Sequence, residues 1–384
     1  MVMCLAGACQ GEPPADSDGQ ASPTGLEARE VFRLGSVDGP DEETLFGRVL
    51  GVELDDDGNV YVLDGLAPAV RVFDSDGQYV RSLGGRGAGP GEFMRPNGLI
   101  ITEDGRLWVR DSGNRRYEMF ESDGTFGGSF RRSFGAGLWN AVIDPDGLIW
   151  ESAVRVTDRE TFATELYFVA VRPSSGVMES VGTVDLPQPT RTVWTVLPTN
   201  GEGGFVSVPF TAEWKARADP RGGFWTGTTD ALRFVRQAPE GDTIQIIERV
   251  VSPRPVSAAE RDRAFEELAD RFGRAALQGS ATEIPDYMPY WNTFFLDRVG
   301  RLWVERYRPP GTPTETLHTW EIYGPDGALL GVLPLPFSGR VTPSVRNDRI
   351  AGIVEDDLGV QYVVVFELWT SEPYHVPDAQ AGMR

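Results

Sequence analysis

The feature that most constrains how this chain can fold is a short unit that recurs along it. The unit is a glycine, a variable residue, an apolar residue and an aromatic residue, and its good copies are Gly58-Asn59-Val60-Tyr61, Gly105-Arg106-Leu107-Trp108, Gly147-Leu148-Ile149-Trp150, Gly222-Gly223-Phe224-Trp225 and Gly300-Arg301-Leu302-Trp303. A degenerate sixth copy, Asp348-Arg349-Ile350-Ala351, lacks the glycine and the aromatic residue. Regular internal repetition is typical of arrays of similar modules, so the six copies predict six modules.

The residue types in the unit are those of a tight turn that leads into a buried strand. Glycine supplies the positive φ of a β-hairpin turn, and the alternating apolar residues after it bury one strand face. In four copies a turn-initiating aspartate stands three residues before the glycine, at Asp55, Asp144, Asp219 and Asp297. A second hairpin glycine follows in five units, at Gly77, Gly124, Gly176, Gly241 and Gly327. Two hairpins make four strands, so we predict an all-β, six-bladed β-propeller with four-stranded antiparallel blades.

One copy carries a longer motif that resembles the NHL repeat. Its residues are Gly84-Gly85-Arg86-Gly87-Ala88-Gly89-Pro90-Gly91-Glu92-Phe93, Pro96-Asn97-Gly98, Asp104-Gly105, Trp108-Val109-Arg110-Asp111 and Asn114-Arg115-Arg116. The resemblance is strong over residues 46–130, and it implies a propeller of the NHL type, similar to bacterial envelope lipoproteins of that fold. In such propellers the Asp and Asn of the loop at 111–115 mostly bond the neighbouring backbone, which is the role we expect here.

The ends of the ring can be located from a second match. The segment Glu30–Gly35 matches Tyr79–Gly84, the outermost strand of the first blade. We therefore predict that residues 26–35 form a strand that completes the last blade, since an open ring would expose an unpaired edge. The propeller is expected to span residues 26–370, after a disordered tether at 1–25 and before a tail at 371–384.

The N-terminus indicates export. Leu5-Ala6-Gly7-Ala8-Cys9 resembles the end of a bacterial lipoprotein signal peptide, in which small residues precede the cysteine that receives lipid. We expect lipidation at Cys9 and a location in the bacterial cell envelope, or secretion. An ordinary ragged terminus is the alternative.

Composition excludes several classes of function. The formal net charge of −21 repels nucleic acid and anionic lipid, so contact with a membrane is expected only through the N-terminal anchor. Cys4 and Cys9 are the only cysteines, and the folded body can therefore hold no disulfide. His318 and His375 are the only histidines, which excludes a three-histidine zinc site. We expect a monomer without a cofactor.

Nearly all extra length falls on one face of the predicted ring. Four long connections join strands there, at 157–164, 199–211, 253–285 and 309–316. The largest opens with Ser257-Ala258-Ala259-Glu260, a capping box, and predicts a helical insertion over 257–278 between blades 4 and 5. We expect this helix over the mouth of the central channel, either as a lid or as a cover for blade edges. Long loops on one side of a rigid scaffold indicate the functional side.

The candidate binding residues lie near the start of each innermost strand, eight residues before the turn glycine, or in neighbouring loops. They mix aromatic faces with amide and cationic tips, as a ligand site requires: Asn97, Arg115, Trp139, Asn140, Trp214, Lys215, Tyr290, Trp291, Asn292 and Arg340. The alternative for the three tryptophans is packing between blades. We expect a non-catalytic protein that binds a peptide, a glycan or a protein at the channel mouth.

Two other functions remain open. Six-bladed lactonases and gluconolactonases hold a calcium-like ion through oxygen ligands, and five residues could imitate that set: Asp64, Asn97, Asp111, Asn140 and Asn292. A metal-dependent hydrolase with calcium is therefore the first alternative. A structural surface scaffold without a ligand is the second.

Overall fold

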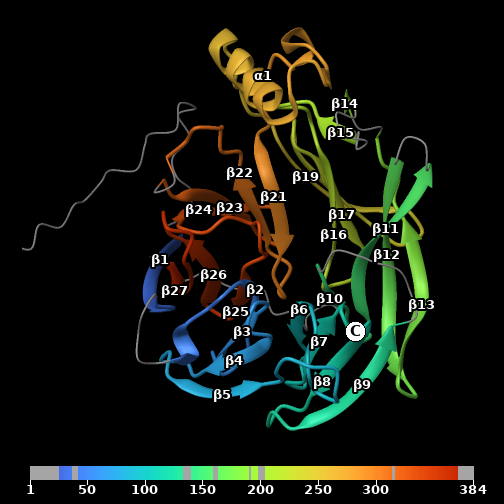
Figure 1. Cartoon of the computed structure of the whole chain (residues 1–384), viewed down its shortest axis with the longest axis vertical. Helices are drawn as coiled ribbons and strands as arrows, with labels where there is room; N and C mark the ends of the chain where they lie inside the picture. Colours follow the sequence, from blue (N-terminus) through green and yellow to red (C-terminus); the bar gives the residue numbers. More distant parts are fainter. Residues whose placement is uncertain are drawn as a thin grey trace, which may run out of the picture.

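The structure is a computed structural model that describes residues 26–36, 42–132, 140–158, 163–189, 192–197, 204–313 and 316–370. Its strands form the six predicted blades, and in Figure 1 the colours run once around the ring. Blade 1 comprises β2 (Val49–Leu54), β3 (Val60–Asp64), β4 (Ala69–Phe73) and β5 (Tyr79–Leu83). Blade 2 comprises β6 (Pro96–Ile101), β7 (Leu107–Asp111), β8 (Arg116–Phe120) and β9 (Phe126–Arg132). Blade 3 comprises β10 (Val142–Ile143), β11 (Ile149–Asp158), β12 (Ala163–Ser174) and β13 (Val177–Asp185).

The last three blades complete the ring. Blade 4 comprises β16 (Trp214–Ala218), β17 (Phe224–Thr228), β18 (Leu232–Gln237) and β19 (Thr243–Arg249). Blade 5 comprises β21 (Trp291–Leu296), β22 (Leu302–Arg306), β23 (His318–Tyr323) and β24 (Leu329–Leu335). Blade 6 comprises β25 (Ser344–Arg346), β26 (Arg349–Glu355), β27 (Gln361–Thr370) and β1 (Leu26–Leu34). A short 3-10 turn, η1 (Glu42–Thr44), lies between β1 and β2. The prediction of an all-β, six-bladed propeller is confirmed.

The N-terminal strand closes the ring as predicted. Strand β1 pairs antiparallel with β27, from Leu26 opposite Thr370 to Leu34 opposite Val363. In Figure 1 the blue strand β1 lies beside the red strand β27. The last blade therefore takes three strands from the end of the propeller and one from its beginning, and β27 has no open edge.

The repeat unit has a physical explanation in one hydrogen bond. In blade 4 the carboxylate of Asp219 accepts the backbone N–H of Arg221 at 2.7 Å and the indole N–H of Trp225 at 2.8 Å. The same bond, from an aromatic residue to the aspartate six positions earlier, recurs in other blades, at Trp150 to Asp144, Trp303 to Asp297 and Tyr61 to Asp55. In these four blades the aspartate, the glycine and the aromatic residue therefore fix the turn together. In the degenerate sixth copy the positive φ, 53°, falls on Asn347, one position before the residue that aligns with the glycine.

Two blades are joined in a way that the sequence did not predict. Strand β9 pairs parallel with β13, through Arg131 opposite Val177 and Arg132 opposite Met178. Blades 2 and 3 therefore form one eight-stranded sheet. This pairing is non-local, and it depends on where the hairpin between β12 and β13 ends.

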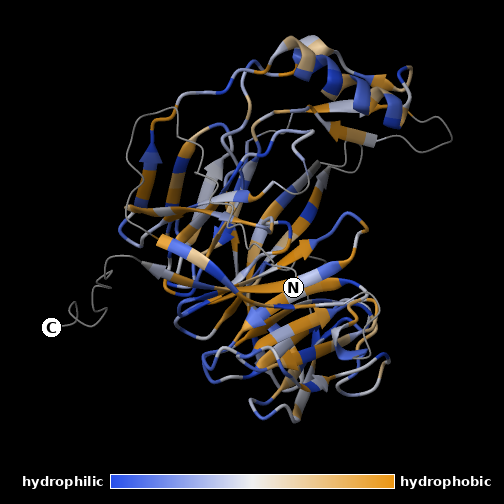
Figure 2. Ribbon diagram, turned by 90° about the vertical axis from the view of Figure 1, so that its left-hand side faces the viewer, coloured by the Kyte–Doolittle hydropathy of each residue, from blue (hydrophilic) through white to orange (hydrophobic). Residues whose placement is uncertain are grey.

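Two of the long connections fold together into a small cap. The cap comprises β14 (Val193–Val196), β15 (Gly204–Ser207), α1 (Ala258–Phe272), β20 (Leu277–Gln278) and the 3-10 turn η2 (Ala281–Glu283), with β14 pairing both β15 and β20. Its core includes Trp194, whose ring centroid lies 5.8 Å from that of Phe265 on α1. Figure 2 shows apolar and polar residues alternating along this helix.

The helix begins where it was predicted and ends earlier. The capping box between Ser257 and Glu260 is present, whereas the helix stops at Phe272 rather than 278 because Gly273 follows with φ 88°. No residue of α1 lines the central cavity described below, so a lid role finds no contact to support it. The position of the helix over the channel mouth stays a prediction. Within the described ranges no helix is long and apolar enough to cross a membrane.

Candidate functional site

The six innermost strands enclose a cavity of about 490 Å³ at the centre of the ring. Every blade contributes to its wall, mostly through the first strand and the turn that follows it. One position of the repeat, five residues before the turn glycine, lines the cavity in all six units, at Glu53, Ile100, Val142, Arg217, Phe295 and Pro343. Four of these residues are apolar, and the two charged ones stand in blades 1 and 4, which are opposite each other in a six-membered ring.

Arg217, on β16, carries a charge that no carboxylate of the described residues neutralises. Its Nη1 donates to the carbonyl of Ala216 at 2.9 Å, and its Nη2 donates to the hydroxyl of Thr293 at 3.3 Å. Its guanidinium carbon lies 5.7 Å from the ring centroid of Phe294. The Nε is buried without a hydrogen-bond partner, and burial lowers the pKa of Arg217 to about 10. A desolvated cation without a counter-ion is unfavourable, so an anion in the cavity would be stabilised beside it.

Glu53, on the opposite wall, is a carboxylate with partners. The hydroxyl of Ser344 donates to Glu53 Oε2 at 2.9 Å and accepts the backbone N–H of Leu54 at 3.0 Å. Burial raises the pKa of Glu53 above its ordinary value of 4.5, although Arg298, Ser344 and Arg346 oppose that shift. Glu53 is therefore a proton-binding group in the cavity wall, whereas Arg217 is a fixed cation.

Two of the predicted binding residues line the cavity. Asn140 and Arg340 lie in its wall, and Arg340 is exposed. Trp139 lies outside the described residues. The others are absent from the lining: Asn97, Arg115, Trp214, Lys215, Tyr290, Trp291 and Asn292.

The tryptophan prediction was wrong for Trp291. This side chain is fully buried, and its ring centroid lies 5.1 Å from that of Phe234 in blade 4 and 5.6 Å from that of Phe294. Its indole N–H donates to the carbonyl of Ala231 at 2.8 Å. Trp291 therefore packs between blades, which was the alternative. Trp214 is half-buried against the core of blades 3 and 4.

The other predicted polar residues are mostly bound to the protein itself. Lys215 pairs with Glu213 at 2.7 Å, and the hydroxyl of Tyr290 donates to a backbone carbonyl at 3.1 Å. Asn292 donates to Glu305 at 3.0 Å. The amide of Asn97 can bond both the carbonyl and the guanidinium of Arg110, and Arg115 is exposed.

Three blades carry a β-bulge at the position eight residues before the glycine. The pairing register shifts between Val49 and Gly51, between Pro96 and Gly98, and between Trp291 and Thr293. The residue left out in each case stands eight residues before the glycine, at Leu50, Asn97 or Asn292, and the last two are predicted binding residues. A bulge redirects the side chain, and of these three only Leu50 reaches the cavity. The position five residues before the glycine follows the bulge, where regular alternation sets the direction.

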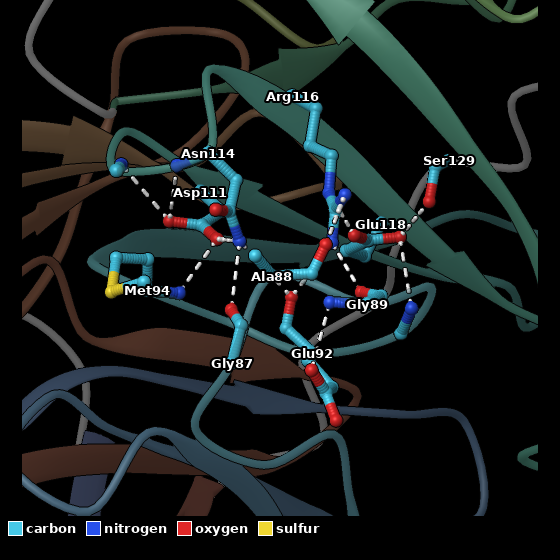
Figure 3. Close-up of polar contacts among 12 residues, drawn as sticks. Gly87, Ala88, Gly89, Glu92, Met94, Asp111, Asn114, Arg116, Glu118 and Ser129 are labelled. Carbon is cyan, nitrogen blue, oxygen red and sulfur yellow. Dashed lines mark hydrogen bonds and ion pairs between the residues drawn. The ribbon is translucent and has the colours of Figure 1, made fainter.

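The carboxylates proposed as metal ligands are structural. Asp111 accepts the backbone N–H groups of Met94 and Arg95, both at 2.8 Å, and the side-chain amide of Asn114 at 2.7 Å. Figure 3 shows these bonds around Asp111. Asp64 holds the equivalent loop of blade 1 and pairs with Arg71 at 3.1 Å. Across the described ranges, no group of three or more His, Cys, Asp or Glu residues could hold a metal ion.

Comparison with known proteins agrees with the fold. Residues 40–128 match the model of a family described as a 6-bladed β-propeller. NHL repeat-containing protein 3 from Homo sapiens is 30% identical over 107 residues, which are 27% of this chain and 28% of that protein. Protein SUPPRESSOR OF QUENCHING 1, chloroplastic, from Arabidopsis thaliana is 33% identical over 92 residues, which are 22% of this chain and 9% of that protein. The chain thus spans less than a third of these relatives.

A solved structure is similar over most of the chain. It is a protein of Bacteroides fragilis whose name describes it as exported, with 13% identity and a TM-score of 0.49, covering 90% of this chain and 96% of that one. A likeness at this level carries no inference about function. The chain is a six-bladed β-propeller with NHL-type repeats, as predicted, and its particular activity has to be argued from the cavity.

Proposed function

We propose that this propeller is a non-catalytic binding protein that takes a small organic anion, such as a carboxylate, into its central cavity. The observation that carries the proposal is Arg217, a desolvated guanidinium in the cavity wall without a carboxylate partner among the described residues. Guanidinium groups bind carboxylates through two parallel hydrogen bonds, and the low dielectric of a buried site strengthens them.

The size and lining of the cavity fit a small molecule better than a folded partner. A volume of about 490 Å³ lies in the range of small-molecule sites, which are mostly apolar with a few polar groups. Ile100, Val142 and Phe295 supply the apolar wall. The anionic group would lie near Arg217, and a hydrogen-bond donor on the ligand could reach Glu53 on the opposite wall.

Two observations favour binding over catalysis. His318, the one histidine within the described ranges, has Nδ1 2.6 Å from Glu305 and Nε2 2.9 Å from Arg308, so both ring nitrogens are occupied. It is also absent from the cavity wall. The alternative of a metal-dependent hydrolase is weakened, because the carboxylates of Asp64 and Asp111 accept hydrogen bonds from the backbone of their own loops.

The binding proposal can be tested with a melting-temperature series. The wild type would be melted with acetate, succinate, glutarate and citrate, each against sodium chloride of equal ionic strength. Ligands that bind only the native state raise the melting temperature in a saturable way. We expect at least one carboxylate to do so for the wild type and for Arg233→Gln, which removes an exposed arginine paired with Glu248, but not for Arg217→Gln. No response in the wild type, or an equal response in Arg217→Gln, would contradict the proposal.

We also propose that the protein is exported and held in the cell envelope by a lipid on Cys9. This rests on the sequence before residue 10 alone. Expressed with an intact signal, the wild type should enter the detergent phase in a phase-partitioning assay, and Cys9→Ala should stay in the aqueous phase. Partitioning that does not change in Cys9→Ala would refute the anchor.

A further inference from the structure

One face of blades 1 and 2 is basic although the chain as a whole carries a net charge of −21. Five exposed arginines lie at the strand ends and in the loops of this face, and none forms an ion pair with a described residue. They are Arg48, Arg86, Arg95, Arg115 and Arg131, here called the arginine face. Of the acidic residues in the same connections, Glu42 and Glu92 are exposed, and Glu92 accepts the backbone N–H of Gly89 at 2.8 Å.

The loops that carry these arginines are bonded to one another. Arg86 donates to the carbonyl of Leu66 at 2.7 Å, which joins the loops after β3 and β5. The carbonyl of Arg95 accepts both the N–H and the hydroxyl of Ser112, at 3.0 and 2.8 Å. The carbonyl of Arg115 accepts the N–H of Arg132 at 3.0 Å. The loops that carry Arg86, Arg95 and Arg115 are therefore held in place by hydrogen bonds to neighbouring segments.

Two apolar side chains stand exposed on the same loops. Leu66 is 65% exposed and Met94 is 43% exposed. The backbone N–H of Leu66 donates to Asp64 at 2.9 Å, and that of Met94 donates to Asp111 at 2.8 Å. These bonds fix the loops in the conformation that exposes both side chains to solvent. The face thus presents separated cations around two fixed apolar groups.

We propose that the arginine face is a second binding site, which docks an acidic, extended segment of a partner protein in which carboxylates alternate with apolar side chains. Each carboxylate would pair with an arginine of the face, and the apolar side chains would cover Leu66 and Met94. Exposed arginines without an ion pair keep guanidinium donors free for pairing with carboxylates. This site is separate from the central cavity, since none of the five arginines lines it.

A narrow segment fits this face better than an anionic membrane. A membrane is a plane, and it would also meet Glu42, Glu43 and Glu92 in the connections on the same side. The cap is built from connections of the same kind, between the fourth strand of one blade and the first strand of the next, and it projects beyond the blades (Figure 1). A peptide can contact the arginines alone, because charges farther than about 8 Å away are largely screened at physiological salt.

The test uses the full chain and a short fluorescent peptide in which glutamate alternates with leucine. Binding is followed by anisotropy for the wild type and for the triple variant Arg48→Glu, Arg95→Glu and Arg115→Glu, whose native side chains make no hydrogen bonds within the described structure. A matched control with the same charge change reverses Arg172, Arg233 and Arg274, which are exposed elsewhere. Melting temperatures of all three proteins confirm folding.

We expect the wild type and the control to bind the peptide, and the triple variant to bind at least about tenfold more weakly, since each lost exposed pair is worth up to about 1 kcal/mol. Arg217→Gln should bind the peptide like the wild type, which separates this site from the cavity. Equal binding by the triple variant would overturn the proposal. So would the absence of peptide binding by the wild type, including the case in which phosphatidylglycerol vesicles bind instead.

Discussion

The hydroxyl of Ser344, on the first strand of the last blade, donates a hydrogen bond of 2.9 Å to the carboxylate of Glu53, on the first strand of the first blade. This bond crosses the seam at which the ring closes, and both residues line the central cavity. The same contact therefore joins the last blade to the first and contributes a polar group to the cavity wall.

Glu53 should make stability depend on pH. Its pKa in the folded protein is raised above the ordinary value of 4.5, mainly by burial, so the native state keeps its proton at pH values where the unfolded chain has lost it. The contribution of Glu53 is thus fully present below pH 4.5 and is lost as the pH rises through the raised pKa. Glu53→Gln, which cannot ionise, should unfold at a higher temperature than the wild type at pH 7, and the difference should vanish in acid.

The matched control for this prediction is Glu248→Gln, which removes an exposed carboxylate. Its melting temperature should follow that of the wild type across the pH range. A Glu53→Gln variant that is less stable than the wild type at pH 7, with the deficit shrinking in acid, would show that the ionised form is the favoured one.

Trp291 should behave as a core residue. It is fully buried between aromatic rings and bonds the carbonyl of Ala231. Trp291→Ala should lower the free energy of unfolding by about 3 to 5 kcal/mol, as for other large buried aromatic residues. Trp291→Phe should lower the free energy of unfolding by less, about 1 to 3 kcal/mol, because the carbonyl of Ala231 loses its hydrogen-bond donor. Urea titration measures both, and a loss below about 1 kcal/mol in the alanine variant would mean that the site is not packed as described.

The closing strand should be essential to the whole ring. Deletion of residues 1–36 removes β1 and leaves β27 as an open edge. It also removes Leu34 from the core that it shares with Val49 and Val363, so we expect a loss of about 3 kcal/mol or more, together with aggregation. Deletion of residues 1–25 alone keeps β1 and is the control. If both deletions melt like the full chain, closure by β1 contributes nothing to stability.

The blades could be predicted from the sequence because their determinants are local. A turn aspartate, a glycine and an aromatic residue within seven positions fix the first hairpin in four of the blades, as Asp219 and Trp225 show. The pairing of β9 with β13 could not be predicted, because nothing near Arg131 in the sequence specifies Val177 as its neighbour. Even the degenerate sixth copy forms a blade, since Asn347 adopts the positive φ that glycine supplies in other blades.

The candidate site was predicted at the start of the innermost strands, whereas the cavity is lined along those strands and by the turns that follow them. β-bulges at Asn97 and Asn292 interrupt the regular alternation at that start, and neither residue lines the cavity. The signal that identifies the cavity was present in the repeat itself: five residues before the glycine, Glu53 and Arg217 are charged where the other blades are apolar. The predicted roles of Asn140 and Arg340 stay predictions, although both line the cavity.

Arg217 should lower the stability of the protein when no ligand is bound. Its charge is desolvated and has no carboxylate partner in the described structure, so Arg217→Met, which keeps much of the side-chain length, should raise the free energy of unfolding by on the order of 1 kcal/mol. The gain is expected in chloride buffer without a carboxylate. A marked loss of stability in Arg217→Met would show that the bonds to Ala216 and Thr293 outweigh the desolvation.

The central claim is that the cavity binds a small organic anion through Arg217, and a crystal structure with a bound ligand tests it most directly. Crystals would be grown with the carboxylate that raises the melting temperature most. We predict electron density for that molecule inside the ring, with a carboxylate oxygen within hydrogen-bonding distance of the Arg217 guanidinium, at about 2.7 to 2.9 Å. Density for the carboxylate only outside the cavity, or inside it but turned away from Arg217, would contradict the claim.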